Sequence, residues 1–150
     1  MSTACFIVPS WHYYKDPLKH TPYWELYYAT YVKKAGLETD VIDIRSMKEN
    51  NKNLDLTKAV NKIPGRNFYF YWIFKSGDAL EIFSIVKLLK NKYPKSIHAA
   101  GGTHVDMSQD ECSKHFDSII VGPGEESFIK VIKDCNENKL LKKYSTNYKS

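Results

Sequence analysis

The sequence predicts an α/β domain in which helices cover a parallel sheet. Short apolar runs alternate along the chain with segments of helical periodicity, and five such strand–helix units follow one another. This alternation is typical of parallel strands joined by helical crossovers. The 150 residues are enough for one domain, and 43% hydrophobic with 26% charged residues is the composition of a globular protein.

The first strand–helix unit has a long connection. An apolar run over residues 4–8 predicts the first strand, and Thr21-Pro22 has the residue types of a helix start. Aromatic side chains then recur at three- and four-residue spacing until Gly36, where the helix is expected to end. The intervening residues 10–21 form a long loop for a strand-to-helix connection, and such loops in compact domains are often functional.

The later units are shorter. Strands are expected at residues 39–44, 68–74, 96–100 and 116–121. Helices are expected between and after them, at residues 56–63, 78–93, 108–115 and from 125. The run 68–74 is apolar and aromatic throughout, which predicts a central strand buried on both faces. The spacing of Asp78 with Glu81, and of Ser108 with Glu111, is typical of capping boxes at two helix starts.

Charge and cysteine content exclude several classes. Residues 130–150 carry six lysines against two acids, and the chain has only two arginines, so we expect no nucleic-acid binding. We expect an α/β domain over 1–138 and a basic tail or linker over 139–150. No apolar run is long enough to span a membrane. The three cysteines form no CxxC pair, which favours a cytoplasmic protein with reduced thiols and no metal or iron–sulfur site.

A ligand site is expected beyond the carboxyl ends of the strands, where open parallel sheets bind ligands. The loops that follow the strands begin at residues 9, 75, 101 and 122, and three of them contain glycine, which lets a flat ligand approach the main chain. The first loop has no GxGxxG, and the chain has no GxxxxGK[ST] and no GxSxG. These absences argue against a dinucleotide-binding domain, a P-loop and an α/β-hydrolase.

Two stretches resemble a known family. Residues 99–104 are AAGGTH, and residues 116–128 are FDSIIVGPGEESF. The amino-terminal cobalamin-binding domain of radical SAM enzymes commonly carries a GG-P-H stretch and then FD-x-x-V-x-G-x-G-E-x-x-F. The helix expected over 23–36 and the following Val41-Ile42-Asp43 also resemble that family. The resemblance extends over about residues 4–134.

The resemblance implies a flavodoxin-like (Rossmann-like) three-layer sandwich, with a five-stranded parallel sheet of order 2-1-3-4-5. It implies that a corrinoid, cobalamin, lies against the strand ends with its nucleotide tail beside Gly101 and Gly102, where Ser76 donates a hydrogen bond. A radical SAM domain or a partner protein would then supply the chemistry. The cofactor-binding residues expected on this basis are Ser10, Trp11, His12, Ser76, Gly77, Gly101, Gly102, Thr103, His104, Gly122, Gly124 and Glu125.

The chain departs from the family in three ways. The loop SWHYYK keeps His12 but lacks the Asp and Gly of a DxHxxG motif, no CxxxCxxC is present for a 4Fe–4S cluster, and Thr103 replaces the usual proline. Two alternatives therefore stay open. One is a degenerate α/β domain that binds no corrinoid and acts through protein–protein contacts. The other is a small enzyme for a nucleotide-like ligand, although no acid–base pair or activated nucleophile is evident, so we leave enzymatic activity open.

Overall fold

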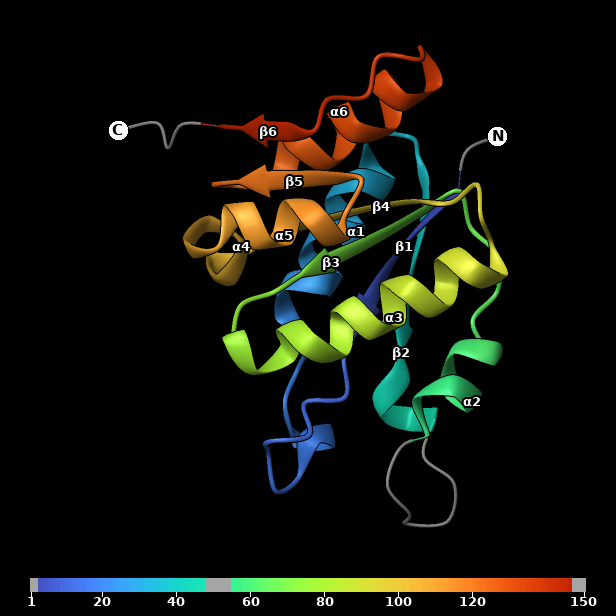
Figure 1. Ribbon diagram of the computed structural model, residues 1–150, viewed down its shortest axis with the longest axis vertical. Coiled ribbons are helices and arrows are strands. Elements are labelled where there is room, and N and C mark those ends of the chain that lie inside the picture. Colours follow the sequence, from blue (N-terminus) through green and yellow to red (C-terminus); the bar gives the residue numbers. More distant parts are fainter. Residues whose placement is uncertain (1–2, 48–54, 147–150) are drawn as a thin grey trace.

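Parallel strands and covering helices form a three-layer structure (Figure 1). The computed structural model describes residues 3–47 and 55–146. The strands are β1 (Thr3–Val8), β2 (Glu38–Asp43), β3 (Phe68–Trp72), β4 (Ile97–Gly101), β5 (Ser118–Val121) and β6 (Lys143–Ser145). The helices are α1 (Tyr23–Lys34), α2 (Leu56–Asn61), α3 (Ala79–Lys92), α4 (Thr103–Met107), α5 (Gln109–His115) and α6 (Glu125–Asn136).

The sheet has the order β2-β1-β3-β4-β5-β6, and all neighbouring strands are parallel. The expected α/β architecture and the order of the first five strands are therefore confirmed. The expectation of five strands is wrong, because β6 lies in the segment over 139–150 that was expected to be a tail or linker. Residues 147–150 of that segment lie outside the described part of the chain.

Tyr144 explains why a lysine-rich segment forms a strand. Its side chain is buried between the exposed Lys143 and Ser145, so one apolar residue faces the core in a three-residue alternation. Its hydroxyl donates to Asp134 Oδ2 at 2.8 Å and accepts from the Leu141 amide at 3.0 Å. A charged outer face suits a strand at a sheet edge, where unpaired backbone groups would otherwise attract other chains.

Each face of the sheet has its own apolar core. Because side chains alternate along a strand, Tyr69 and Tyr71 of β3 pack against α2, α3 and α5, whereas Phe68, Phe70 and Trp72 pack against α1 and α6. All five residues are buried, as predicted, but the strand ends at Trp72, and Phe74, the last residue of the predicted strand, is 53% exposed.

His98 is a buried structural residue on the same side of the sheet as Tyr69 and Tyr71. Its Nδ1 shares a hydrogen bond of 2.9 Å with the Tyr71 hydroxyl, and its Nε2 shares one of 2.9 Å with Ser96 Oγ. Burial lowers the pKa of this imidazole to about 3. A neutral, fully bonded histidine is the form that a buried site accepts.

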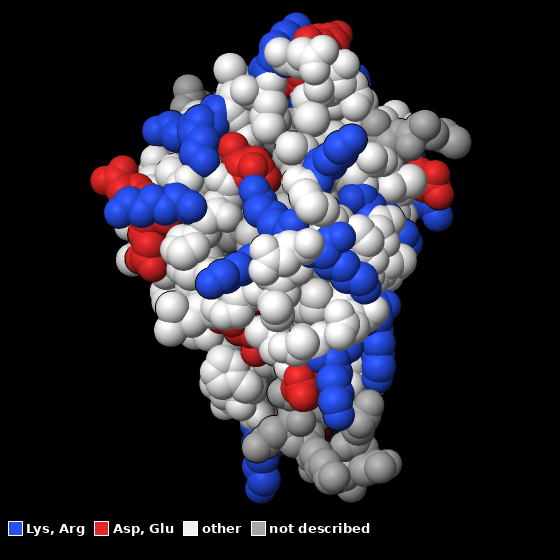
Figure 2. All heavy atoms as spheres, turned by 45° about the vertical axis from the view of Figure 1, so that its right-hand side comes forward, with Lys and Arg blue, Asp and Glu red and all other residues white. Residues whose placement is uncertain are grey.

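The surface shown in Figure 2 carries Lys and Arg side chains over much of its height, with Asp and Glu side chains between and beside them. The expectation that the chain binds no nucleic acid stays a prediction. Among the described residues, no helix has both the length and the apolar character needed to cross a membrane.

The order of the strands creates one switch point. The chain passes from β1 through α1 to β2 on one side, and then returns to place β3 on the other side of β1. The loops that follow β1 and β3 therefore diverge at the carboxyl edge of the sheet. In doubly wound folds, this divergence opens the crevice in which ligands bind.

Candidate functional site

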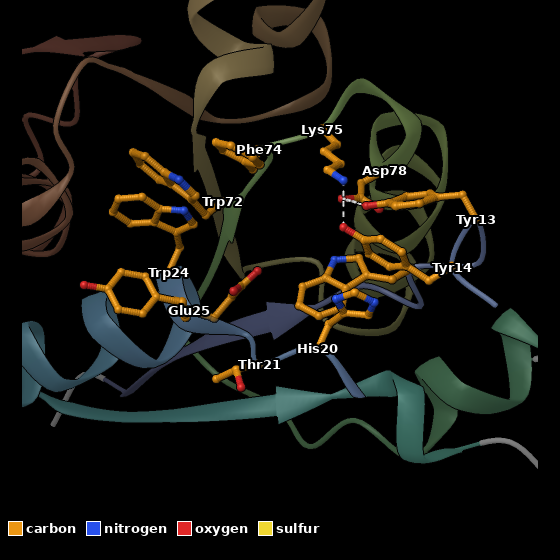
Figure 3. A pocket seen from close by; sticks show the side chains of 12 residues that line it. Tyr13, Tyr14, His20, Thr21, Trp24, Glu25, Trp72, Phe74, Lys75 and Asp78 are labelled. Atoms are coloured by element: carbon orange, nitrogen blue, oxygen red, sulfur yellow. Dashed lines mark hydrogen bonds between the residues drawn. The ribbon is translucent and has the colours of Figure 1, made fainter. Parts of the chain in front are cut away.

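A pocket of about 360 Å³ opens at this switch point (Figure 3). Its walls come from the loop after β1, the first turn of α1, and the segment from the end of β3 to the start of α3. Most of the lining side chains are aromatic, and they include Trp11, Tyr13, Tyr14, Trp24, Trp72 and Phe74. A pocket therefore lies between β1 and β3 at the strand ends, the edge of the sheet at which a ligand site was expected.

One wall is built from the loop after β1. Tyr14 stacks on His20 with ring centroids 3.8 Å apart, and Trp11 lies edge-on to both rings. The guanidinium of Arg45 lies 4.6 Å from the centre of the Trp11 ring and donates to the carbonyls of Pro17 and His20, at 2.8 and 2.6 Å. These contacts hold the loop in one shape.

The opposite wall joins α1 to β3. The rings of Trp24 and Trp72 lie 5.9 Å apart, and Tyr28 packs against both of them, 4.5 Å from Trp72. Trp72 and Tyr28 are buried, whereas Trp24 is more exposed. In Figure 3, this wall faces the rings of Tyr13 and Tyr14 across the pocket.

Two buried carboxyl groups line the pocket between these walls. Asp78 and Glu25 are each 4% exposed. Asp78 Oδ2 accepts from the Tyr13 hydroxyl at 3.1 Å, but the buried Oδ1 has no hydrogen-bond partner among the described residues. Burial is the main cause that raises the pKa of Asp78 to about 6 and that of Glu25 to about 7. A buried acceptor without a donor is costly, so Oδ1 is the atom that a ligand donor would satisfy.

Lys75 stands at the rim above the tyrosines. Its Nζ donates to the Tyr14 hydroxyl at 2.7 Å and lies 4.7 Å from the centre of the Tyr14 ring. It lies 5.6 Å from the centre of the Tyr13 ring. The ammonium group is therefore attached to the aromatic wall, as Figure 3 shows, and makes no ion pair with Asp78 among the described contacts.

Glu81 anchors the loop instead of capping α3. Its Oε1 accepts from the Ser10 amide at 2.7 Å, and its Oε2 accepts from the Ser10 hydroxyl at 2.5 Å. Asp78 makes no side-chain capping bond, and Ser108 makes none at the start of α5. The predicted capping boxes are therefore wrong, because in the first of them both acids serve the pocket and its loop.

Of the three residues expected to bind a cofactor from the first loop, only Trp11 lines the pocket. Its positive φ of 51° turns the chain there. Ser10 is buried behind the loop, bonded to Glu81. His12 is exposed and its Nδ1 lies 3.7 Å from Glu81, outside the pocket lining.

A second group of expected residues meets at the ends of β3 and β4. Ser76 Oγ shares a hydrogen bond of 2.8 Å with His104 Nδ1. The buried Nε2 of His104 has no partner among the described residues. Activation of a serine nucleophile needs a group that orients the second ring nitrogen of the histidine. The pair therefore lacks the third member of a catalytic triad. Thr103 is exposed at the start of α4.

The expected glycine cradle is covered by the chain itself. A Cβ atom on Gly101 would lie 2.7 Å from Cζ3 of Trp72, and one on Gly124 would lie 3.0 Å from the same atom. One on Gly102, where φ is +110°, would lie 2.5 Å from the carbonyl oxygen of Ile73. These glycines permit close internal packing, and none of them faces open space.

The remaining expected residues also serve internal contacts. The Gly122 amide donates to Asp106 Oδ1 at 3.0 Å, and the Gly77 main chain lies under the Tyr13 ring. Glu125 accepts from the Tyr27 hydroxyl at 2.9 Å and so connects α6 to α1.

The residues at the glycine turns do not fit the nucleotide tail of a corrinoid. That tail needs a crevice beside Gly101 and Gly102, but the ring of Trp72 covers Gly101, and the main chain of Ile73, the residue after β3, covers Gly102. Trp72 is itself 9% exposed and packs on Tyr28 and Phe128. A bound tail would have to displace this indole from the core. Among the described residues, no group of three or more His, Cys, Asp or Glu side chains could hold a metal ion.

Sequence reasoning missed Glu25, Trp72, Lys75 and Asp78 as site residues. Glu25 and Asp78 each stand at a helix start, where an acid is usual for electrostatic reasons. Trp72 ends an apolar strand, so its pattern is that of a core residue. The signal that could have found them is their common position after the carboxyl ends of β1 and β3.

The fold and the pocket together define a doubly wound, Rossmann-like α/β domain with a pocket at its switch point. The chain matches no model of a known protein family, and no curated protein is significantly similar to it. Among solved structures, it is similar to the N-terminal domain of the hypothetical protein TM0182 of Thermotoga maritima. The sequence identity is 23%, the TM-score is 0.46, and the match covers 68% of this chain and 80% of that one.

Proposed function

We propose that this chain is a binding domain for a small, flat organic ligand, which lies in the pocket between β1 and β3. The observation that carries the proposal is an aromatic pocket at the switch point whose lining includes Asp78, a residue with a buried and unpartnered Oδ1. Small-molecule sites are typically concave, mostly apolar and provided with a few polar groups that fix orientation. This pocket has each of these properties.

The size and the walls of the pocket indicate the shape of the ligand. A volume of about 360 Å³ is at the lower end of small-molecule sites and suits one ring system with its substituents. Planar ligands stack on aromatic side chains, and the wall formed by Trp24 and Trp72 faces that formed by Tyr13 and Tyr14. A donor group on the ligand would bond to Asp78 Oδ1.

Corrinoid binding, which the sequence resemblance implies, would require a different conformation. The indole of Trp72 would have to leave Gly101 and Gly124 before a nucleotide tail could enter. Removal of such a buried aromatic side chain from its core costs about 3–5 kcal/mol by analogy with truncation. We therefore expect the protein to leave hydroxocobalamin unbound.

Tryptophan fluorescence is a direct test, because the chain has three tryptophans and all of them line the pocket. We expect flat heteroaromatic compounds such as nicotinamide, 1-methylnicotinamide and adenosine to include at least one that quenches this emission saturably. Trp11→Ala should weaken that binding by roughly tenfold through the loss of a stacking surface, while Leu80→Ala, an exposed residue outside the pocket, should not change it.

Hydroxocobalamin is the decisive comparison. The protein is mixed with it and passed through a gel-filtration column, and we expect the protein to elute without colour. A coloured complex near one-to-one stoichiometry would overturn the proposal and support the corrinoid. A protein that binds neither class of compound would favour the alternative in which the domain acts through protein–protein contacts.

A further inference from the structure

The charges around the pocket are unbalanced. Asp78 and Glu25 reach it from two different elements, the turn after β3 and the first turn of α1. Both residues are buried, with 4% of each exposed to solvent. Among the described residues, no ion pair within 4.0 Å joins either carboxyl group to a Lys, Arg or His side chain.

The nearby basic groups are already engaged, among them His20, which lines the pocket and stacks on Tyr14. Arg45 pairs with Asp43 at 2.7 Å and donates to two backbone carbonyls. Lys75 donates to Tyr14 and lies against the tyrosine rings. His12 lies beside Glu81 on the outer side of the loop. The carboxyl groups in the pocket are thus left to attract a positive charge from outside the chain.

The aromatic walls favour the same kind of ligand. The face of an aromatic ring attracts a cation, and several faces around one site form the kind of cage that proteins use for quaternary ammonium groups. Trp11, Trp24 and Trp72, the side chains best suited to this interaction, all line the pocket. The rings and the acids are independent features, and both select for positive charge.

From this juxtaposition we infer that the ligand of the pocket is a flat organic cation, whose charge lies near Asp78 Oδ1 and Glu25 and whose ring lies between the aromatic walls. The inference rests on the proposed function and names its ligand class: an N-alkylated or protonated heteroaromatic ring. The carboxylate of Asp78 attracts the charge, and Tyr13, which donates to its other oxygen, holds it in position.

Binding of such a cation depends on pH through the protein. The pKa of Asp78 is raised to about 6 and that of Glu25 to about 7, so both acids are largely ionised at pH 8 and largely protonated at pH 5. The charged groups that face Asp78 are Lys75, His12 and Glu81, with the Tyr13 hydroxyl, and those that face Glu25 are Arg45, Asp43 and Asp78 itself. A permanent cation should therefore bind more weakly as the pH falls.

A matched pair of probes tests the inference. Nicotinamide and 1-methylnicotinamide share one flat ring and one amide, but only the second carries a permanent positive charge. We expect 1-methylnicotinamide to quench tryptophan emission with roughly tenfold higher affinity at pH 8. This preference should fall several-fold at pH 5, because the affinity for nicotinamide, which carries no charge, is expected to change less than that for the cation.

Two variants assign the effect to the acids. Asp78→Asn and Glu25→Gln keep the shape of each side chain and remove its charge, so each should reduce the preference for the cation, and Leu80→Ala should keep it. Circular dichroism identifies any variant that fails to fold, in which case the other variant and the pH profile of the wild type decide. Equal affinity for the two probes would overturn the inference and leave the proposed function standing. If neither probe binds, the inference is overturned, and the proposed function fails for nicotinamide-type rings. The adenosine titration then tests the proposed function separately.

Discussion

Trp72 shows how a single residue changes the meaning of a motif. Gly101 and Gly102 stand after a strand, as they would in a cofactor cradle, but here Gly101 provides space for the Trp72 ring. Gly102 adopts a positive φ of 110° against the main chain of Ile73, just after β3. A cofactor cradle requires glycine so that a ligand can approach the main chain, and close internal packing requires glycine so that the protein's own atoms can approach it. The Gly-Gly motif after a strand is the same in the two cases.

We predict that Gly102→Ala destabilises the fold much more than Gly36→Ala. Both glycines have positive φ, but a Cβ on Gly36 would meet nothing within 4 Å, whereas one on Gly102 would lie 2.5 Å from a carbonyl oxygen. We expect a loss of about 1 kcal/mol at position 36 from backbone strain alone and of more than about 3 kcal/mol at position 102 from overpacking. Urea unfolding of both variants measures the difference, and equal losses would contradict it.

The buried acids Asp78 and Glu25 work against stability at neutral pH. Their pKa values in the folded protein lie above those of the unfolded chain, so the folded state gains from their protonation. That contribution is present at low pH and is lost as the pH rises through about 6 and 7. Groups that reduce stability at the working pH are typical of binding sites, where function sets the residue type.

At the scale of elements, the loop after β1 is a fixed part of the structure. Glu81 on α3 holds Ser10 near its start, and Arg45 in the turn after β2 holds its last part. Helix α3, which follows β3, and the turn after β2 therefore both bond to the loop after β1. A pocket with such preformed walls loses little conformational entropy when a ligand binds.

Replacement of Glu81 should loosen this loop. Glu81→Ala removes two hydrogen bonds to a charged acceptor, and we expect a loss of about 2 kcal/mol in the free energy of unfolding. We also expect faster cleavage by trypsin at Lys15 and Lys19, which are both exposed. Glu111→Ala is the matched control, because Glu111 has the same position in the other predicted capping box and is exposed. Equal cleavage rates in the two variants would show that Glu81 does not hold the loop.

The sequence predicted the regular elements well, because each carries its own periodic pattern. The alternation over 39–44, the apolar run over 68–74 and the glycine after α1 each lie at or near the element that the structure contains. The strand around Tyr144 was missed because one apolar residue among lysines gives no pattern. Capping was predicted wrongly because Glu81 bonds to a residue 71 positions away, a partner that no local pattern reveals.

The candidate site could be located but not described from the sequence. Its position follows from strand order, since the loops after β1 and β3 must diverge at the switch point. Its chemistry depends on which side chains turn toward one another, and that depends on packing across the sheet. Trp72 and Glu25 belong to segments whose patterns indicate a core strand and a helix start. Only their arrangement in space makes them the walls of a pocket.

At the scale of the whole molecule, β6 completes the sheet and one of its two cores. Tyr144 belongs to the core beneath α1 and α6, the same core that contains Trp72. We predict that Tyr144→Ala lowers the free energy of unfolding by about 3 kcal/mol, through lost burial and two lost hydrogen bonds. Lys143→Ala on the same strand is exposed and should change it by less than about 0.5 kcal/mol.

Chemical denaturation of the two variants separates these outcomes. A small effect at both positions would mean that β6 adds nothing to the stability of the domain. Greater self-association of Tyr144→Ala in gel filtration is a second expected result, because loss of β6 exposes the edge of β5.

Because all strands of the sheet are parallel, they begin at one edge of the sheet and end at the opposite edge. β1 begins with Thr3 at the amino edge of the sheet, whereas β6 ends with Ser145 at the carboxyl edge. A surface tether or a fluorophore at the start of β1 would therefore stand at the amino edge of the sheet, opposite the edge at which the pocket opens. The same attachment at the end of β6 would stand at the carboxyl edge, which makes the start of β1 the better position for immobilised binding measurements.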